Sequence, residues 1–232
     1  MIKALLALLP SGIKRPVYRW VFGYSVGKRV RIGLSIIDAD DCRIDDDVEI
    51  GHFNLFVLTK KLRIGEHARI GHFNVIRGGD EVSLGRYCEI IRWNEINSIP
   101  DPVVINETEP KFALGDGAVI VASHKIDFTD RVELGKRVIL GGRNSSIWTH
   151  NRQRTKPVTI GDNAYVGSEI RMAPGSAIPA NCIVGIGAVV TRALKGENKL
   201  IAGVPAKACA DLDEEARFFT EYKTRPDLPD DL

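Results

Sequence analysis

The pentapeptide IGHFN occurs twice in this chain, at Ile50–Asn54 and again at Ile70–Asn74, twenty residues apart. Its neighbours repeat with it, because aliphatic residues recur six positions apart and glycine often follows them, as in Ile64-Gly65. Near the C-terminus the same step runs without interruption through Ile160, Val166, Met172, Ile178, Val184 and Val190. A period of six fits neither a helix, whose side chains repeat about every 3.6 residues, nor one long strand, whose side chains repeat every second residue.

A hexapeptide repeat of this kind is typical of a β-helix, in which each hexad forms a short strand and a turn, and three hexads close one coil. A bare coil would take about eighteen residues, so a spacing of twenty indicates two extra residues at the same corner of each coil. We therefore expect an all-β fold, a parallel β-helix with an N-terminal helical cap and a short C-terminal helix.

Alignment of the repeats in columns predicts where individual side chains point. The expected inward residues are Ile44, Ile50, Ile64, Ile70, Leu84, Ile90, Leu114, Ile120, Leu134, Leu140, Ile160, Val166 and Val184. The expected stack of polar residues at one corner is Asn54, Asn74, Asn94, His124 and Asn144. Phe53, Phe73 and Trp93 are expected to form an outward aromatic stripe, an exposure that monomers rarely leave uncovered. Either neighbouring copies in a trimer or the N-terminal helix would cover it.

Length and composition fit one repeat domain. The chain has 232 residues with 44% hydrophobic content, and stacked coils bury a continuous core without a second domain. We expect a helical cap over residues 1–25, the β-helix over 26–191 and a closing segment with a helix over 192–232. Two stretches break the repeat, and we expect loops near 97–113 and 147–159, where a repeat protein often carries its function.

Cysteines, charge and hydropathy exclude several classes of protein. The four cysteines have neither disulfide nor metal spacing, which suits a reducing cytoplasm. The net charge of +2, with no basic patch interleaved with aromatic residues, argues against a nucleic-acid partner. No apolar run approaches the roughly eighteen residues of a membrane span, and we expect the opening MIKALLALLP to be retained.

The N-terminal segment is strongly basic. Residues 1–37 hold seven Lys or Arg and no acid. We expect this segment to form a helix that covers the open first coil, as a solenoid requires. The alternative is a peripheral helix on the inner face of the membrane, held by anionic lipids.

The stretch IGDNAYVGSEIRMAPGSAIPANCIVGIGAVVTRALKGENKLIAGVPAKACA, residues 160–210, resembles the left-handed β-helix hexapeptide acyltransferases, the family of the galactoside, maltose and serine acetyltransferases. Within that family it is most similar to enzymes that acetylate sugars during surface-polysaccharide assembly, and AGVPAK is its most specific motif. The resemblance implies a left-handed β-helix, an acetyltransferase that uses acetyl-CoA and a sugar or glycan acceptor without a metal, and a homotrimer that shares each active site.

Acyl transfer from a thioester needs a base to take the proton of the incoming hydroxyl or amine. Histidine is the side chain best suited to this near neutral pH. Of the five histidines, His150 lies in a long loop that breaks the repeat, and in the resembling enzymes the base occupies this loop. We therefore expect His150 to be the general base, and His124, which falls in the asparagine column, to be structural.

The resemblance places the coenzyme A site along the last coils. Ser168 matches the family serine of IGS and is implied to bond the pantetheine arm or the thioester region, and Thr191 matches the threonine of VVT. Lys207, in GVPAK, matches a basic residue that meets phosphate, a role that suits its point charge. Tyr165 stands where many relatives have tryptophan. Ile186 replaces the family alanine, which keeps a backbone contact and narrows the groove.

The acceptor is less well defined. Trp148, Arg143, Arg152 and Arg154 surround His150 in the sequence and are candidates to bind a sugar by stacking and hydrogen bonds, an anionic group by charge, or the phosphates of a nucleotide sugar. These residues are compatible with transfer of the acetyl group to either an oxygen or a nitrogen atom.

Two other functions are alternatives. His67 and His72 are five residues apart, a spacing that gamma-class carbonic anhydrases use for two of three zinc ligands, although the third ligand is missing at the expected position. The second alternative is a non-catalytic β-helix scaffold that keeps the coenzyme groove and acts by binding.

Overall fold

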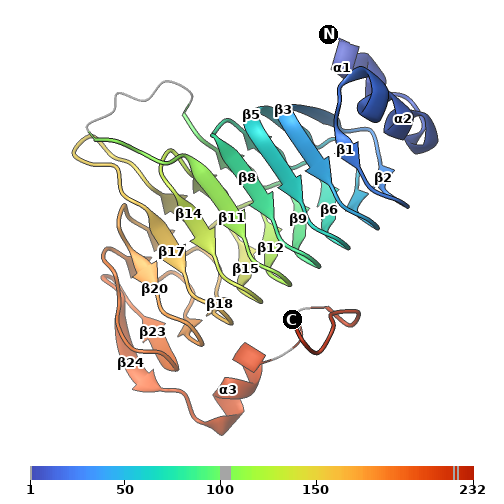
Figure 1. The fold of residues 1–232 in the computed structure, drawn as a ribbon. Coiled ribbons are helices and arrows are strands. Elements are labelled where there is room, and N and C mark those ends of the chain that lie inside the picture. Colours follow the sequence, from blue (N-terminus) through green and yellow to red (C-terminus); the bar gives the residue numbers. More distant parts are fainter. Residues whose placement is uncertain (1, 100–105, 222, 224) are drawn as a thin grey trace.

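The computed structural model describes residues 2–99, 106–221, 223 and 225–232, and it shows parallel strands stacked coil upon coil (Figure 1). The predicted hexapeptide-repeat β-helix is confirmed. Among the described strands, neighbouring coils pair in parallel, and the last pair, β23 with β24, is antiparallel. The helices also follow the prediction, with α1 (Ile2–Leu6) and α2 (Ser11–Val21) before the coils and α3 (Glu214–Glu221) after them.

The strands form three faces. The first face holds β1 (Ser25–Val26), β8 (Glu81–Leu84), β11 (Lys111–Leu114), β14 (Val132–Leu134), β17 (Val158–Ile160) and β20 (Ala177–Ile178). The second face holds β2 (Arg31–Ile32), β4 (Glu49–Ile50), β6 (Arg69–His72), β9 (Glu89–Arg92), β12 (Val119–Ala122), β15 (Ile139–Arg143), β18 (Tyr165–Val166), β21 (Ile183–Val184), β23 (Lys199–Ala202) and β24 (Lys207–Asp211). The third face holds β7 (Val75–Arg77), β10 (Glu95–Asn97), β13 (Lys125–Asp127), β16 (Ser146–Trp148), β19 (Arg171–Met172) and β22 (Val189–Val190).

Two long strands turn the corner between the third and first faces. These are β3 (Ile36–Ile44) and β5 (Leu55–Ile64). The first residues of β5 pair with β7, and its last residues pair with β8. In these two coils a single strand therefore runs through the corner between the third and first faces. Later coils carry their inserted residues at this corner.

The core is a column of aliphatic side chains inside the coils. All thirteen residues predicted to point inward are buried, each at most 3% exposed. The register explains this result, because Ile50 pairs with Ile70, and Ile70 pairs with Ile90. Stacked coils demand the same residue type at the same position, which is why the pentapeptide repeats.

The polar stack at the corner between the second and third faces is confirmed for its first four members. Asn54 Oδ1 accepts the backbone N–H of Asn74 at 3.0 Å, and Asn74 Oδ1 accepts that of Asn94 at 3.0 Å. Asn94 Oδ1 then accepts the backbone N–H of His124 at 3.0 Å. These side chains are at most 2% exposed, and each therefore satisfies a buried backbone donor of the next coil.

The prediction for the fifth member, Asn144, is wrong. Asn144 is exposed with a φ of 61°, and buried Ser145 takes the position, donating its backbone N–H to His124 Nδ1 at 3.2 Å. The cause is one extra residue in β15. Ile120 pairs with Leu140, but Ala122 pairs with Arg143, so later residues of this coil are displaced by one.

The aromatic stripe of Phe53, Phe73 and Trp93 lies along this same corner and is exposed at 56%, 38% and 56%. The rings stack with centroids 5.0 Å and 4.1 Å apart. The N-terminal helices leave this stripe open to solvent.

The N-terminal cap closes the first coil with cations. Lys14, although 1% exposed, donates through Nζ to the carbonyls of Ile32 and Gly33. Arg15 donates to the carbonyl of Gly27 at 3.2 Å, and Arg19 donates to that of Val26 at 2.7 Å. The basic residues of this segment thus satisfy carbonyls that would otherwise face no further coil. No helix in the described part of the chain has the length and apolar character to span a membrane.

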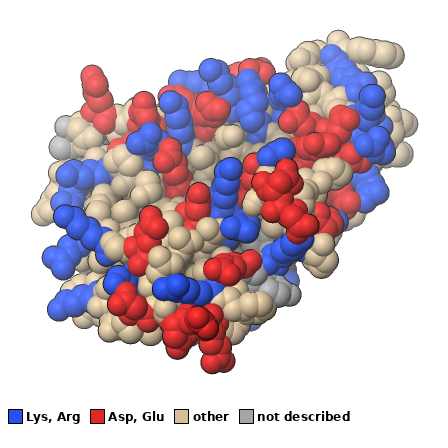
Figure 2. All heavy atoms as spheres, turned by 60° about the horizontal axis from the view of Figure 1, so that its bottom comes forward, with Lys and Arg blue, Asp and Glu red and all other residues tan. Residues whose placement is uncertain are grey.

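The surface carries mixed charge. Figure 2 shows basic and acidic side chains interspersed over the face it presents. Many pair between neighbouring coils, as Arg86 does with Asp116 at 3.1 Å and Lys125 does with Glu95 at 3.6 Å. Exposed pairs of this kind contribute little to stability individually.

Both predicted loops fall between strands. The segment between β10 and β11 extends from residue 98 to 110, of which 100–105 lie outside the described residues. The segment between β16 and β17 extends from residue 149 to 157. Both leave the coils at the corner between the third and first faces.

Candidate active site

His150 is the second residue after β16 and contacts Asp127, the last residue of β13 on the preceding coil. Its Nδ1 lies 2.5 Å from Asp127 Oδ2, and the side chain of Asp127 is 7% exposed against 29% for His150. Because an ionised carboxylate can only accept hydrogen bonds, Nδ1 carries the proton and the Nε2 lone pair is left available. We call these two residues the His150–Asp127 dyad. The contact holds the imidazole in one orientation and one tautomer.

The carboxylate of the dyad is itself held on both oxygens. Asp127 Oδ1 accepts the backbone N–H of Thr129 at 3.0 Å and its hydroxyl at 2.7 Å. Asp127 Oδ2 also lies 3.4 Å from the hydroxyl of Thr149. These contacts fix the orientation of the Asp127 carboxylate independently of its contact with the imidazole.

Reasoning from the sequence missed Asp127. A step of twenty sets Asp127 over Ile147, an inward position, but the structure pairs Asp127 with Trp148. The extra residue in β15 produces this shift and brings His150 into reach of the carboxylate. The only sequence signal was the glycine pair Gly141-Gly142, where a residue can be added at a positive φ of 62°.

The loop after His150 forms a tight turn. Asn151 Oδ1 accepts the backbone N–H of Gln153 at 2.8 Å and that of Arg154 at 3.0 Å. His150 forms an antiparallel bridge with Thr155, which closes the turn. Arg152 and Arg154 are exposed on it, so this loop presents two guanidinium groups beside the dyad.

The other two candidates for acceptor binding lie apart from each other. Trp148 ends β16, is 37% exposed, and has Lys125 Nζ 5.6 Å from its ring centroid. Arg143 ends β15 and is exposed at the corner between the second and third faces. Trp148 is thus on the side of the dyad, whereas β16 separates Arg143 from it.

The residues implied for coenzyme A lie mainly along the corner that carries Arg143. Ser168 Oγ fills the space beside Gly142, where an added Cβ would lie 1.6 Å away. The backbone N–H of Gly187, next to Ile186, donates to the carbonyl of Ser168 at 3.0 Å. Ile186 is 73% exposed, and Lys207 is exposed at the start of β24.

Tyr165 and Thr191 complete the predicted set. Tyr165 begins β18 on the second face and is 39% exposed. Thr191 follows β22 and is exposed on the edge of the third face that also leads to His150. Within one chain, therefore, His150 and most of the predicted coenzyme residues occupy opposite edges of the third face.

The remaining histidines have structural surroundings. His124 is 1% exposed, and burial lowers its pKa to about 4. His52 and His72 stack with ring centroids 5.5 Å apart, and His72 Nδ1 accepts the backbone N–H of His52 at 2.9 Å. His67 stacks instead on Tyr87 at 4.6 Å. His67 and His72 therefore belong to different stacks, which argues against the zinc-ligand pair of the carbonic anhydrase alternative.

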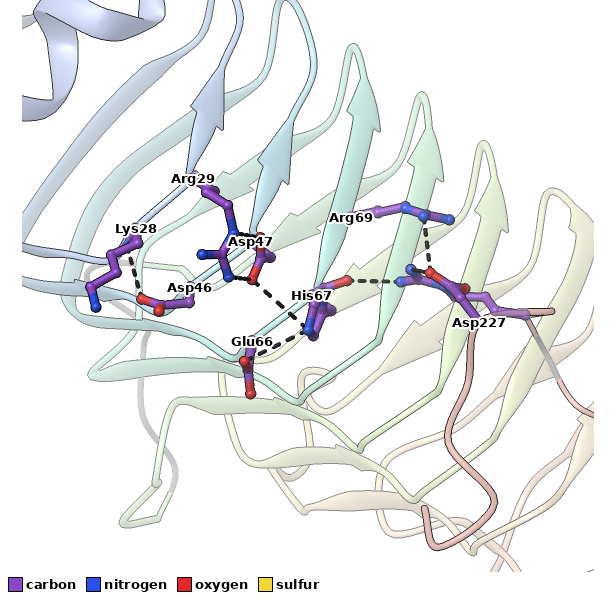
Figure 3. Close-up of polar contacts among 9 residues, drawn as sticks. Lys28, Arg29, Asp46, Asp47, Glu66, His67, Arg69 and Asp227 are labelled. Atoms are coloured by element: carbon purple, nitrogen blue, oxygen red, sulfur yellow. Dashed lines mark hydrogen bonds and ion pairs between the residues drawn. The ribbon is translucent and has the colours of Figure 1, made fainter.

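In the described part of the chain, one group of three side chains could bring ligand atoms within 4.8 Å of one another, namely Asp47, Glu66 and His67 (Figure 3). Arg29 donates to both carboxylate oxygens of Asp47 at 2.5 Å and holds the pKa of that carboxyl below its usual range. His67 Nε2 is 3.6 Å from Glu66. The group is a half-buried ion-pair network in which the Asp47 carboxylate is already paired with the Arg29 guanidinium.

The C-terminal segment docks beside this network, as Figure 3 also shows. Arg225 is 3% exposed and donates to the carbonyls of His67 at 2.9 Å and Tyr87 at 3.1 Å. Asp227 accepts from Arg225 at 2.6 Å and from Arg69 at 3.0 Å. The end of the chain is thus fastened to the first half of the β-helix (Figure 1).

The chain has hexapeptide repeats and the fold of a parallel β-helix, and its sequence is similar to that of a known acetyltransferase. No protein-family model matches it. It is 27% identical over 110 residues to galactoside O-acetyltransferase of Escherichia coli (strain K12), an alignment that covers 45% of this chain and 54% of that protein. The chain thus matches about half the length of this curated relative.

Two solved structures are also similar. A hexapeptide transferase family protein from Anaplasma phagocytophilum is 18% identical with a TM-score of 0.40, covering 70% of this chain and 82% of that one. A perosamine N-acetyltransferase from Caulobacter crescentus, in complex with CoA and GDP-perosamine, is 21% identical with a TM-score of 0.41, covering 87% of this chain and 66% of that one.

Proposed function

We propose that this protein transfers an acetyl group from acetyl-CoA to a hydroxyl or amino group of a sugar, in the synthesis of surface polysaccharide or a related glycoconjugate. The observation that carries the proposal is the contact of His150 with buried Asp127 in a loop that breaks the repeat. Similarity to galactoside O-acetyltransferase supports the same chemistry.

The dyad suits direct transfer between two bound substrates. Nε2 of His150 takes the proton of the acceptor hydroxyl or amine as that atom attacks the thioester carbonyl. The carbon–sulfur bond then breaks, and the imidazolium returns its proton to the departing sulfur of coenzyme A. Asp127 stabilises the imidazolium between these two steps, since it is a carboxylate 2.5 Å from Nδ1.

Binding of the two substrates is assigned to opposite sides of the third face. Half-buried Ser168 and exposed Ile186 and Lys207 form a row suited to the pantetheine arm and phosphates of acetyl-CoA, with Tyr165 and Thr191 as further contacts. Trp148, Arg152 and Arg154 are assigned to the acceptor. Arg143 is assigned to the substrate that binds at the corner between the second and third faces. No metal is required by this chemistry.

We further propose a homotrimer that shares its active sites. Two observations support it. The aromatic stripe is uncovered in the single chain. In addition, His150 and the row containing Ser168 and Lys207 lie on opposite edges of one face, so a base from one chain and a coenzyme groove from its neighbour would form a complete site.

A reducing compartment, the cytoplasm, is the proposed location. Cys42, Cys88 and Cys182 are buried and unpaired, and Cys209 is exposed and unpaired. The contacts of Lys14, Arg15 and Arg19 with backbone carbonyls favour the cap over the membrane alternative for the N-terminal segment.

Two variants test the proposal by release of free thiol from acetyl-CoA in the presence of a panel of sugars. His150→Ala should lower kcat by about two to four orders of magnitude, the usual contribution of a general base, with the KM for acetyl-CoA nearly unchanged. Lys207→Ala should raise that KM and leave kcat unchanged, because a phosphate contact is felt equally in the ground and transition states. Wild-type turnover by His150→Ala would reject the assignment of the base.

A further inference from the structure

The two loops that break the repeat meet and border a cavity of about 740 Å³. Residues 106–109 form one side, residues 155–157 form the other, and Asp130 lies between them. Asn106 joins the two loops, because its side chain donates to the carbonyl of Thr155 at 3.0 Å and accepts the backbone N–H of Thr155 at 3.1 Å. A volume of this size lies within the usual range of small-molecule sites.

The cavity adjoins the dyad through two direct connections. Thr155, which lines the cavity, forms the backbone bridge with His150. Asp130 donates its backbone N–H to the hydroxyl of Thr149 at 3.0 Å, and that hydroxyl lies 3.4 Å from Asp127 Oδ2. A molecule in this cavity would therefore lie next to the loop that carries His150, a residue that does not itself line the cavity.

The charge of the cavity is one-sided. Asp130 is 5% exposed, and its Oδ1 accepts the backbone N–H groups of Glu109 at 3.1 Å and Arg131 at 2.8 Å. Its Oδ2 has no hydrogen-bond partner among the described residues. Glu107 and Glu109 add two carboxylates to the lining, and Lys156 adds one ammonium. The carboxylate of Glu109 also lies 3.8 Å from Lys111 Nζ. A buried carboxylate with an oxygen to spare is an acceptor for hydroxyl or ammonium hydrogens and cannot donate to a phosphate or another carboxylate.

We propose that this cavity is the acceptor subsite and that it takes the ring of a neutral or amino sugar, with Asp130 Oδ2 accepting a hydrogen bond from the ring. It selects against rings that carry phosphate or carboxylate, since those would bring a like charge against three carboxylates, with the single ammonium of Lys156 as the opposing charge. The guanidinium groups of Arg152 and Arg154 lie outside this lining. The assignment of the cavity to the acceptor rests on the proposed acetyl transfer; its preference for uncharged or amino sugars does not.

Binding is measured first, by ligand-observed NMR with methyl glucoside, methyl glucosaminide, glucose 6-phosphate and methyl glucuronide. The first two should bind at least tenfold more tightly than the last two, as expected for hydrogen bonds to a charged group set against an unpaired like charge. Asp130→Asn keeps an oxygen for the two backbone N–H groups, and it should weaken the neutral and amino sugars about tenfold. Glu107→Gln should reduce the difference in binding affinity between neutral and anionic sugars.

Glu133→Gln is the matched control, because Glu133 is a carboxylate on neighbouring β14 that does not line the cavity. Should Asp130→Asn fail to fold by circular dichroism, Glu107→Gln decides the question. Equal binding of neutral and anionic sugars, no binding of any sugar, or variants that match Glu133→Gln would each overturn the proposal.

Thiol release with the same sugars separates this inference from the proposed function. Selective sugar binding without turnover would reject acetyl transfer and keep the charge-selective sugar site. Turnover that is equally fast with anionic and neutral sugars would keep acetyl transfer and reject this subsite. A rise of about tenfold in the acceptor KM of Asp130→Asn, with the KM for acetyl-CoA unchanged, supports both.

Discussion

The role of Asp127 can be measured by replacing it with asparagine. Asp127→Asn retains the shape of the side chain and an oxygen for the two Thr129 donors, but it removes the negative charge 2.5 Å from His150 Nδ1. The variant therefore changes the group that orients the imidazole and stabilises the imidazolium, while acetyl-CoA still meets the same residues.

The size of the effect follows from the contact that is lost. A hydrogen bond to a charged group is worth about 1.5–3 kcal/mol, and each 1.36 kcal/mol corresponds to about a tenfold change in rate. Because Asp127 is buried, water cannot replace it. We expect kcat to fall about 10- to 150-fold, which is less than the loss in His150→Ala, with the KM for acetyl-CoA unchanged.

A double-mutant cycle makes the test specific. Once His150 is alanine there is no imidazole left to orient, so adding Asp127→Asn should change the residual rate by less than about threefold. Asp41→Asn, the same change at an exposed carboxylate near the N-terminal end, serves as the control, and melting curves confirm folding. Independent, multiplicative losses from the two substitutions, or an unchanged kcat in Asp127→Asn, would refute the dyad.

Three further predictions concern assembly and stability. Trp93→Glu places a charge in the exposed aromatic stripe, and light scattering at micromolar concentration should show trimers for the wild type and monomers for the variant; a variant trimer would remove the stripe from the interface. Asn74→Ala leaves the buried N–H of Asn94 without its acceptor, so the free energy of unfolding in urea should fall by about 1–3 kcal/mol; an unchanged midpoint and slope would contradict the stack. Arg225 holds the pKa of Asp227 below its usual range, so the contribution of this pair is complete above about pH 4 and is lost as pH falls through the lowered value. Amide exchange in residues 225–232 should therefore be faster in Asp227→Asn than in the wild type at pH 7, with a difference that shrinks in acid; a difference that grows in acid would contradict this reasoning.

The core was predictable because a single physical requirement recurs in every coil. Each coil must place an aliphatic side chain directly over the one before it, so counting by six and twenty finds the interior. Counting fails where one residue is added. The bulge at Gly141-Gly142 is compatible with the local sequence, yet it moved Asn144 out of the stack and brought Ser145 into it.

The candidate site was predictable only in part for the same reason. His150 was found because a histidine in an inserted loop stands out from the repeat. Asp127 was missed because its contact depends on the displaced register between β13 and β16, which no fixed period contains. The cavity beside Asp130 depends on two insertions that are 49 residues apart at the contact of Asn106 with Thr155 and that meet only in space.

The cationic closure of the first coil gives the molecule two chemically different ends. At the far end the chain turns back as antiparallel β24, whereas at the near end the carbonyls of Val26, Gly27 and Ile32 are covered by side chains of α2. An uncovered coil edge is a template on which another chain can continue the same parallel pairing. We therefore expect that a chain trimmed before residue 22, which lacks these three side chains, would expose the edge of the first coil to pairing with another chain.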